Sequence, residues 1–236
     1  MLIGRAPPPE VIEKAGSLDE IVNYIDRAPP LRQVELRALR GRLTTVVGSF
    51  GVSLSDADRE TVDRFHMRFV AEGLRLQFNS FGRQPQYGYP TLRELLLETD
   101  RQGVRRGYLA SEDDFQFVKR LHAEHRIVPV VGDLSGSSAL AAIARFLTRE
   151  KLQVAAFYTS NVEFYLVRDG RFADFMTNLQ RLPRLPGAVI VRSVFRPGVS
   201  TPRVPGYNSV SLTQPIDALV EGYASGRFRQ YWELTR

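Results

Sequence analysis

Two short stretches of this 236-residue chain hold polar residues that could contact a ligand. The first is Gly132–Ser137, GDLSGS, where the glycines allow backbone to approach a ligand closely and a following helix would offer free N–H groups to an anion. Asp133 could accept hydrogen bonds from a ribose, an amine or an adenine amino group. A tight turn capped by Ser or Asp is the alternative, and the sequence leaves both interpretations open.

The second stretch follows an apolar run at residues 154–158. The ring of Tyr158 could stack on a ligand, and Asn161 could bind a base, an amide or a carboxylate. Glu163 could serve as a base, although a capping box with Ser160 explains it equally well. Arg192 ends another apolar run and either grips a carboxylate or phosphate or extends into solvent.

These residues form the predicted site. We expect a set of cofactor contacts and a smaller set of substrate contacts. The sequence identifies no catalytic residue, and we expect no metal ligand in the site. The cofactor set is Gly132, Asp133, Gly136, Tyr158 and Asn161, and the substrate set is Glu163 and Arg192.

Several chemistries are excluded or disfavoured by residue type and spacing. The chain has no cysteine, which excludes thiolate nucleophiles and thiolate metal sites. The turn at residues 132–137 is neither GxGxxG, a Walker loop nor GxSxG. His122 and His125 are three residues apart, whereas metal pairs on helices are often four apart, and no third ligand is evident.

Composition narrows the partners and the location. The net charge is +6, but the cations are nearly all arginine, spread along the chain without a long basic run, which argues against nucleic-acid binding. The longest apolar runs have strand length, too short to cross a bilayer. No secretory leader is recognisable at the N-terminus, and with no cysteine a cytoplasmic location is expected.

The elements that must position these residues are predicted from periodicity. Residues 1–76 read as a helical cap, and residues 77–236 as an α/β domain. Helix starts are predicted where a side chain can cap the first turn, at Ser17, Ser55, Thr91 and Ser111. Apolar runs at 127–131 and 154–158, with a helix from residue 137 between them, predict a βαβ unit, and 188–191 predicts a third strand. We therefore predict a Rossmann-like, mostly parallel sheet with its ligand at the carboxyl ends of the strands.

Long phrases of the chain carry a family resemblance. YGYPTLRELL, YLASEDDFQFVKRLHAEHRIVPVVGDLSGSSALAAIARFL, AAFYTSNVEFYL and VIVRSVF resemble a family of uncharacterised bacterial proteins, similar in turn to S-adenosylmethionine-dependent methyltransferases. The resemblance implies a Rossmann-like fold, S-adenosylmethionine as cofactor, and possible methyl transfer to an unknown acceptor. The family pattern matches at Gly132, Asp133, Gly136, Ser160, Asn161 and Glu163.

The resemblance also implies a departure. The family has a longer N-terminal segment, with a glycine-loop strand and a strand ending in an acidic residue, whereas this chain starts at MLIGRAPPPE. We therefore expect a fragment or a shortened protein whose sheet is incomplete on its N-terminal side, with an exposed edge open to self-association. The alternative function is a non-catalytic binding or interaction protein that keeps only the fold.

Overall fold

The computed structural model describes residues 8–14, 16–78, 89–195, 209–228 and 230–235. Contacts divide the chain into two compact units, Met1–Ile127 and Val128–Arg236. This division falls about fifty residues after the boundary expected from sequence at residues 76 and 77.

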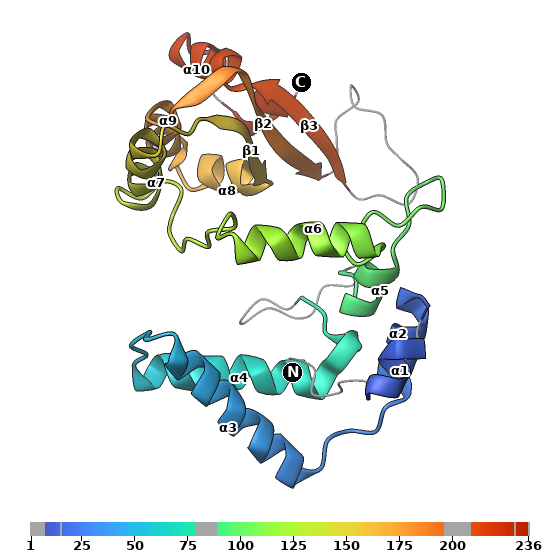
Figure 1. Ribbon diagram of the computed structural model, residues 1–236. Coiled ribbons are helices and arrows are strands. Elements are labelled where there is room, and N and C mark those ends of the chain that lie inside the picture. The colour runs from blue at the N-terminus through green and yellow to red at the C-terminus, as the bar shows by residue number, and fades with distance from the viewer. Residues whose placement is uncertain (1–7, 15, 79–88, 196–208, 229, 236) are drawn as a thin grey trace. The chain divides into compact units, whose positions relative to one another are not determined.

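Helices make up nearly all the regular structure described in unit 1, apart from one isolated bridge between Gln77 and Thr91 (Figure 1). Their bounds are α1 Pro9–Lys14, α2 Leu18–Arg27, α3 Gln33–Ser49, α4 Asp56–Glu72, the 3₁₀ helix η1 Gly73–Arg75, α5 Leu92–Leu97 and α6 Glu112–Ala123.

Local capping explains where several of these helices begin. The side chains of Ser17, Ser55, Thr91 and Ser111 each accept a hydrogen bond from the backbone N–H three residues later. Such caps satisfy donors that the first helical turn leaves free. The sequence-based predictions of these four starts are confirmed.

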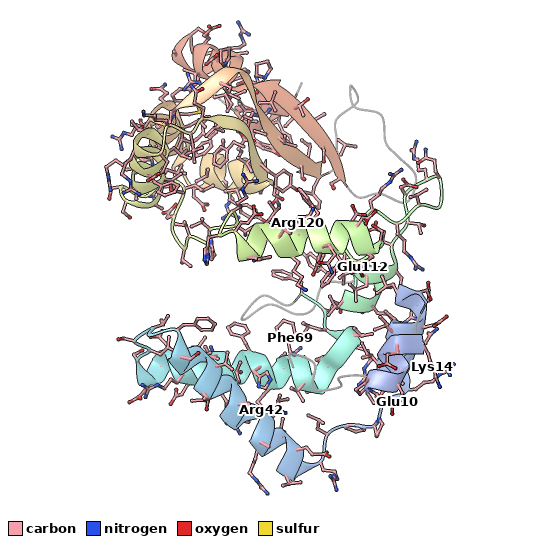
Figure 2. The ribbon with its side chains drawn as sticks, in the orientation of Figure 1. Glu10, Lys14, Arg42, Phe69, Glu112 and Arg120 are labelled. Atoms are coloured by element: carbon pink, nitrogen blue, oxygen red, sulfur yellow. The ribbon has the colours of Figure 1, made fainter. Side chains whose placement is uncertain are left out.

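Charges at helix ends add to this local stability. Glu10 lies in the first turn of α1 and Lys14 in the last, and Glu112 and Arg120 occupy the corresponding ends of α6 (Figure 2). Acidic groups near a helix N-terminus and basic groups near its C-terminus interact favourably with the helix dipole.

Unit 1 has a small core. Val22 and Ile25 of α2 pack with Leu74 of η1, and partly buried leucines of α5 pack against them. Asp19 and Asp26 of α2 form ion pairs with Arg105 and Arg93 at the edge of this cluster.

Unit 2 is built on a three-stranded sheet. Its elements are α7 Ala139–Arg149, β1 Val154–Ser160, α8 Val162–Arg168, α9 Phe172–Gln180, β2 Arg184–Phe195, β3 Ser209–Pro215, α10 Ile216–Ala224 and the 3₁₀ helix η2 Tyr231–Thr235. The strand order is β1-β2-β3.

The pairing within this sheet is mixed. β1 pairs with β2 in parallel, and β2 pairs with β3 antiparallel. The predicted mostly parallel, Rossmann-like sheet is therefore wrong. Two of its expected strands are present, since residues 154–158 lie in β1 and residues 188–191 lie in β2.

The expected first strand is the source of the error. Residues 127–131 adopt neither helix nor strand, and their apolar side chains are exposed, Val131 completely so. A run of apolar residues can satisfy strand preference only where a partner strand accepts its hydrogen bonds. Among the described residues, no strand pairs with this run. β3, whose residues are largely polar, was not predicted.

Core residues of unit 2 come from α7, α8, α9, β2, α10 and η2. α7 and α9 lie side by side (Figure 1). Phe157 of β1 stacks against Phe175 of α9, which is completely buried. This packing holds the segment before α7 and the end of β1, where the predicted site residues are located.

Candidate functional site

The residues selected from sequence form two groups in unit 2. Gly132, Asp133 and Gly136 belong to the turn before α7. Tyr158, Asn161 and Glu163 lie at the end of β1 and in the first residues that follow, and Arg192 faces them from β2, where it is in register with Ser160.

The turn is closed by Asp133 itself. Oδ1 of Asp133 accepts hydrogen bonds from the backbone N–H and the hydroxyl of Ser135, both at 2.8 Å. The backbone N–H of Gly136 donates to the carbonyl of Asp133 at 3.0 Å. Of the two interpretations that the sequence left open, the structure contains the tight turn, although Ser138, not Asp133, precedes α7.

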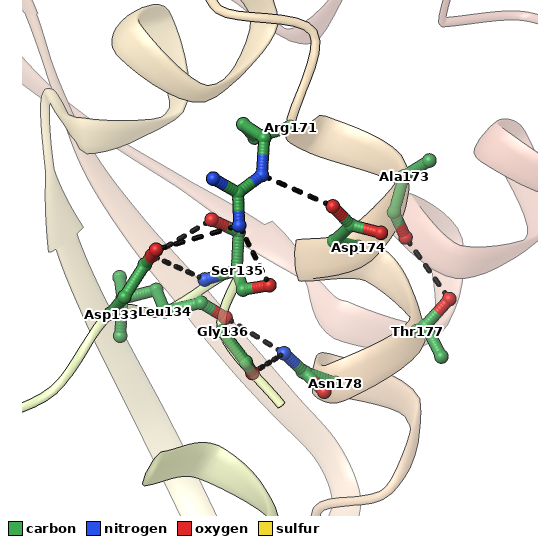
Figure 3. Close-up of polar contacts among 9 residues, drawn as sticks. All are labelled: Asp133, Leu134, Ser135, Gly136, Arg171, Ala173, Asp174, Thr177 and Asn178. Atoms are coloured by element: carbon green, nitrogen blue, oxygen red, sulfur yellow. Dashed lines mark hydrogen bonds and ion pairs between the residues drawn. The ribbon is translucent and has the colours of Figure 1, made fainter. Parts of the chain in front are cut away.

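Two side chains of the α9 region hold this turn from the other side (Figure 3). Nδ2 of Asn178 donates to the carbonyl of Leu134 at 3.0 Å and to that of Gly136 at 2.8 Å. Nη2 of Arg171 donates to the carbonyl of Ser135 at 3.3 Å and lies 3.5 Å from Oδ2 of Asp133. Loop carbonyls that would otherwise lack partners are thereby satisfied.

Neither Arg171 nor Asn178 was selected from sequence. Asn178 could have been, because it lies on the apolar face of α9 between Phe175 and Leu179 and is itself buried. A buried polar side chain in such a stripe must find a hydrogen-bond partner. Arg171 carries no comparable indication.

The electrostatics of the turn favour a charged Asp133. Hydrogen bonds from the Ser135 hydroxyl and then the Ser135 backbone N–H lower the pKa of Asp133, and the positive charge of Arg171 adds to this effect. The carboxylate is ionised at neutral pH, and one of its oxygens already has two donors.

The two glycines are explained by packing inside the protein. A Cβ on Gly132 would lie 2.3 Å from Cβ of Ala139, the first residue of α7. A Cβ on Gly136 would lie 3.2 Å from the carbonyl oxygen of Asp133. The close approach that suggested a ligand is an approach to the chain's own atoms.

At the end of β1, Tyr158 is exposed but its hydroxyl is bonded. The side chain is 62% exposed, and its oxygen lies 3.1 Å from Oγ of Ser193 on β2. Hydrogen bonding by Ser193, and then by Ser160, lowers the pKa of Tyr158. The ring is free to contact another molecule.

Asn161 precedes α8 and its side chain does not cap that helix. Its carbonyl accepts a hydrogen bond from the backbone N–H of Phe164 at 3.2 Å. Ser160 adopts a left-handed backbone conformation with φ of 53°. The capping box expected from Ser160 and Glu163 is therefore absent from this helix start.

Glu163 and Arg192 are paired with each other inside unit 2. Their side chains are 0% and 1% exposed, and Nε and Nη2 of Arg192 contact the two carboxylate oxygens of Glu163 at 2.6 and 3.1 Å. Nη1 of Arg192 donates to Oε1 of Gln214 on β3 at 2.9 Å and to the carbonyl of Leu234 at 3.0 Å.

This arrangement turns both side chains inward, and the substrate-binding role expected of them stays a prediction. A buried guanidinium whose donors already reach a carboxylate, an amide and a carbonyl has little capacity left for an anionic ligand. Instead the pair joins β2 to α8, β3 and η2. The hydroxyl of Thr159 lies 3.4 Å from Oε2 of Glu163, which joins it to this network, and 3.3 Å from the carbonyl of Val191.

In the part of the chain that the structure describes, no three His, Asp or Glu side chains are grouped as metal ligands would be. Over the same residues, no helix combines the length and the apolar character needed to cross a membrane.

Comparison with known proteins identifies a family. No curated protein matches the chain. Residues 56–221, which extend from the start of α4 into α10, match the family described as Domain of unknown function (DUF7790). Because this match covers most of the 236 residues, the chain belongs to that family.

Proposed function

We propose that this protein is a non-catalytic binding protein, and that its sheet is extended at β1 by the same strand of a second copy. Two of the predicted ligand groups, Glu163 and Arg192, are neutralised by each other, and Asp133 closes its own turn. Groups that satisfy each other inside a fold are poorly placed to act on a substrate.

The open edge of β1 is the observation that carries the proposal. Among the described residues β1 pairs with β2 alone, and Ala155, Ala156 and Tyr158 are exposed on it. Proteins usually protect such edges with charged residues, proline or a bulge that twists the edge away. The segment Val154–Ser160 contains no charge and no proline. Its register with β2 is irregular between Val154 and Ala156 and between Tyr158 and Ser160, and is regular from Ala156 to Tyr158.

A second copy matches this edge by symmetry. Two copies related by a two-fold axis bring the same strand together in opposite directions, so β1 would pair antiparallel with β1 of the partner. The small side chains of Ala155 and Ala156 would allow the two backbones to approach without steric conflict. Three strands would become a continuous sheet of six.

The test is the molecular mass of the full chain in solution, measured by sedimentation equilibrium over a range of protein concentrations. We expect a reversible dimer. Ala156→Lys places two like charges at the paired edges and should raise the dimer dissociation constant by about tenfold or more. Thr213→Lys, an exposed position on β3 at the other edge of the sheet, is the matched control and should have little effect.

Two results would contradict the proposal. One is a wild-type chain that stays monomeric at every concentration tested. The other is a dimer that Thr213→Lys dissociates while Ala156→Lys leaves it intact, since that would assign the interface to β3. Circular dichroism of both variants verifies that neither substitution unfolds the protein.

A small-molecule function is the second candidate, and the exposed ring of Tyr158 beside Asn161 favours it. The ligand expected from the resemblance is S-adenosylmethionine, with methyl transfer to an unknown acceptor. Isothermal titration calorimetry with S-adenosylmethionine and S-adenosylhomocysteine should give a Kd of about micromolar. Tyr158→Ala and Asn161→Ala should each abolish this binding. If both variants bind as tightly as wild type, neither residue belongs to the site.

The location proposed for either function is the cytoplasm. The absence of cysteine from the sequence is compatible with a reducing compartment.

A further inference from the structure

Most of the net positive charge of the chain belongs to unit 2. Residues 128–236 contain thirteen arginine and lysine residues and eight acidic residues, a net charge of +5. Residues 1–127 contain nineteen arginine and lysine residues and eighteen acidic residues, a net charge of +1. The second unit thus carries +5 of the overall charge of +6, and an anionic partner would be attracted there.

Several arginines of unit 2 are neutralised within the fold. Those that form ion pairs with carboxylates away from α7 are Arg168 with Asp169, Arg171 with Asp133 and Asp174, Arg184 with Asp217, and Arg192 with Glu163. Arg145 and Arg181 differ from these arginines in lacking such a partner: within the described residues, no carboxylate forms an ion pair with either of them, so both charges are available to a ligand.

Arg145 and Arg181 line the same hollow. It has a volume of about 550 Å³ and lies along α7 and the end of α9, with Arg149 as its third arginine. The other residues that line the hollow have short side chains: Ala141, Ala144 and Thr148. Small side chains between long basic ones leave room for an anion between the guanidinium groups.

The three arginines are held to different degrees. Nη1 of Arg181 donates to Oδ1 of the buried Asn178 at 3.2 Å, the same residue that anchors the Asp133 turn. The guanidinium of Arg149 lies 5.3 Å from the ring of Phe146, and its Nε donates to Glu150 at 2.7 Å. For Arg145, no hydrogen bond or ion pair is found among the described residues.

Glu150 is the acidic group bonded to this cluster, and it takes one N–H of Arg149. Three guanidinium groups against one carboxylate leave a local excess of positive charge. Arg145 and Arg149 are also four residues apart on α7, so their charges face one another and repel. A bound anion would relieve that repulsion.

We propose that this hollow binds phosphate groups. Guanidinium is planar and donates two parallel hydrogen bonds to a phosphate, and arginine outnumbers lysine here. A free polyphosphate compound and a nucleic-acid backbone present the same phosphate chemistry to the three arginines. The proposal is independent of dimer formation through β1.

The test uses the full chain and inorganic tripolyphosphate, with binding measured by isothermal titration calorimetry at low ionic strength. The double variant Arg145→Gln/Arg181→Gln should weaken binding by about tenfold or more, because each lost charge-assisted bond contributes substantially. The control, Arg168→Gln/Arg227→Gln, removes the same charge from unit 2 outside the hollow and should retain wild-type affinity within about twofold.

A second arm distinguishes the sources of the phosphate. Fluorescence anisotropy measures binding of a labelled twelve-nucleotide single-stranded RNA by the same three proteins. If the ligand is a nucleic-acid backbone, RNA binds more tightly than tripolyphosphate, and the salt dependence of the Arg145/Arg181 double variant is shallower than that of wild type. If RNA binds no better, the ligand is a smaller phosphate compound.

Two outcomes would overturn the proposal. Wild type that binds neither probe excludes a phosphate site. Equal loss of affinity in the hollow variant and the control variant assigns the binding to overall charge instead of this cluster.

Discussion

Removing either member of the Glu163–Arg192 pair would leave the other charge buried without its partner. Arg192→Met should therefore lower the free energy of unfolding by about 3–5 kcal/mol. Arg168→Met breaks an exposed pair with Asp169 and should cost about 0–1 kcal/mol. Urea denaturation followed by circular dichroism measures both.

A double variant sharpens this prediction. Glu163→Leu with Arg192→Met replaces both charges by apolar groups, and it should cost less than the sum of the single changes because no uncompensated charge remains. Additive losses would mean that the two residues stabilise unit 2 separately, through partners such as Gln214, and not as a pair.

At the same scale, the ionisation of Asp133 contributes to stability over a defined pH range. Its pKa in the folded protein is lowered, chiefly by the Ser135 hydroxyl, so its contribution is complete above the ordinary aspartate pKa and is lost as pH falls through the lowered value. Urea titrations from pH 7 to pH 2 should show wild type and Asp133→Asn converging in stability at the acid end. A constant difference would exclude this role.

At the scale of elements, the junction between the turn and α7 depends on the absence of a side chain at residue 132. Gly132→Ala would place a methyl group against Ala139 and should destabilise unit 2 by about 1–3 kcal/mol. Adding Ala139→Gly restores the space and should recover most of the loss, as measured by chemical denaturation.

Gly107 provides the matched control for this substitution. No atom lies within 4 Å of a Cβ built there, and alanine should be tolerated without a comparable loss. If Gly132→Ala is as stable as Gly107→Ala, the contact with Ala139 does not constrain the turn.

At the scale of the whole molecule, the two units differ in how much they bury. Unit 2 has a core drawn from six helices and strands, whereas the core cluster of unit 1 rests on Val22, Ile25 and Leu74. The long helices α3 and α4 contain one buried residue each, Leu39 and His66. Helices with so little burial open readily.

Hydrogen exchange measured by mass spectrometry on the full chain tests this difference. Amides of α3 and α4 should exchange at least about tenfold faster than those of α9 and β2, because local opening exposes little apolar surface. Equal protection in α3 and α9 would show that the first two long helices are buried by contacts other than those within unit 1.

The sequence by itself determined the features that depend on near neighbours. Ser17, Ser55, Thr91 and Ser111 were identified as helix starts, because a cap is completed by a backbone N–H only three residues away. The apolar runs in β1 and β2 were recognised because burial imposes that composition on a strand.

Only the tertiary structure decided which distant groups meet. Residues 127–131 have the composition of a buried strand but no described partner, and β3 is paired despite its polar residues, since pairing depends on which edge is available in space. Arg192 and Glu163 are twenty-nine residues apart, and the fold joins them in a buried ion pair that the sequence did not predict. Local spacing cannot encode such contacts, because folding alone brings them within hydrogen-bond distance.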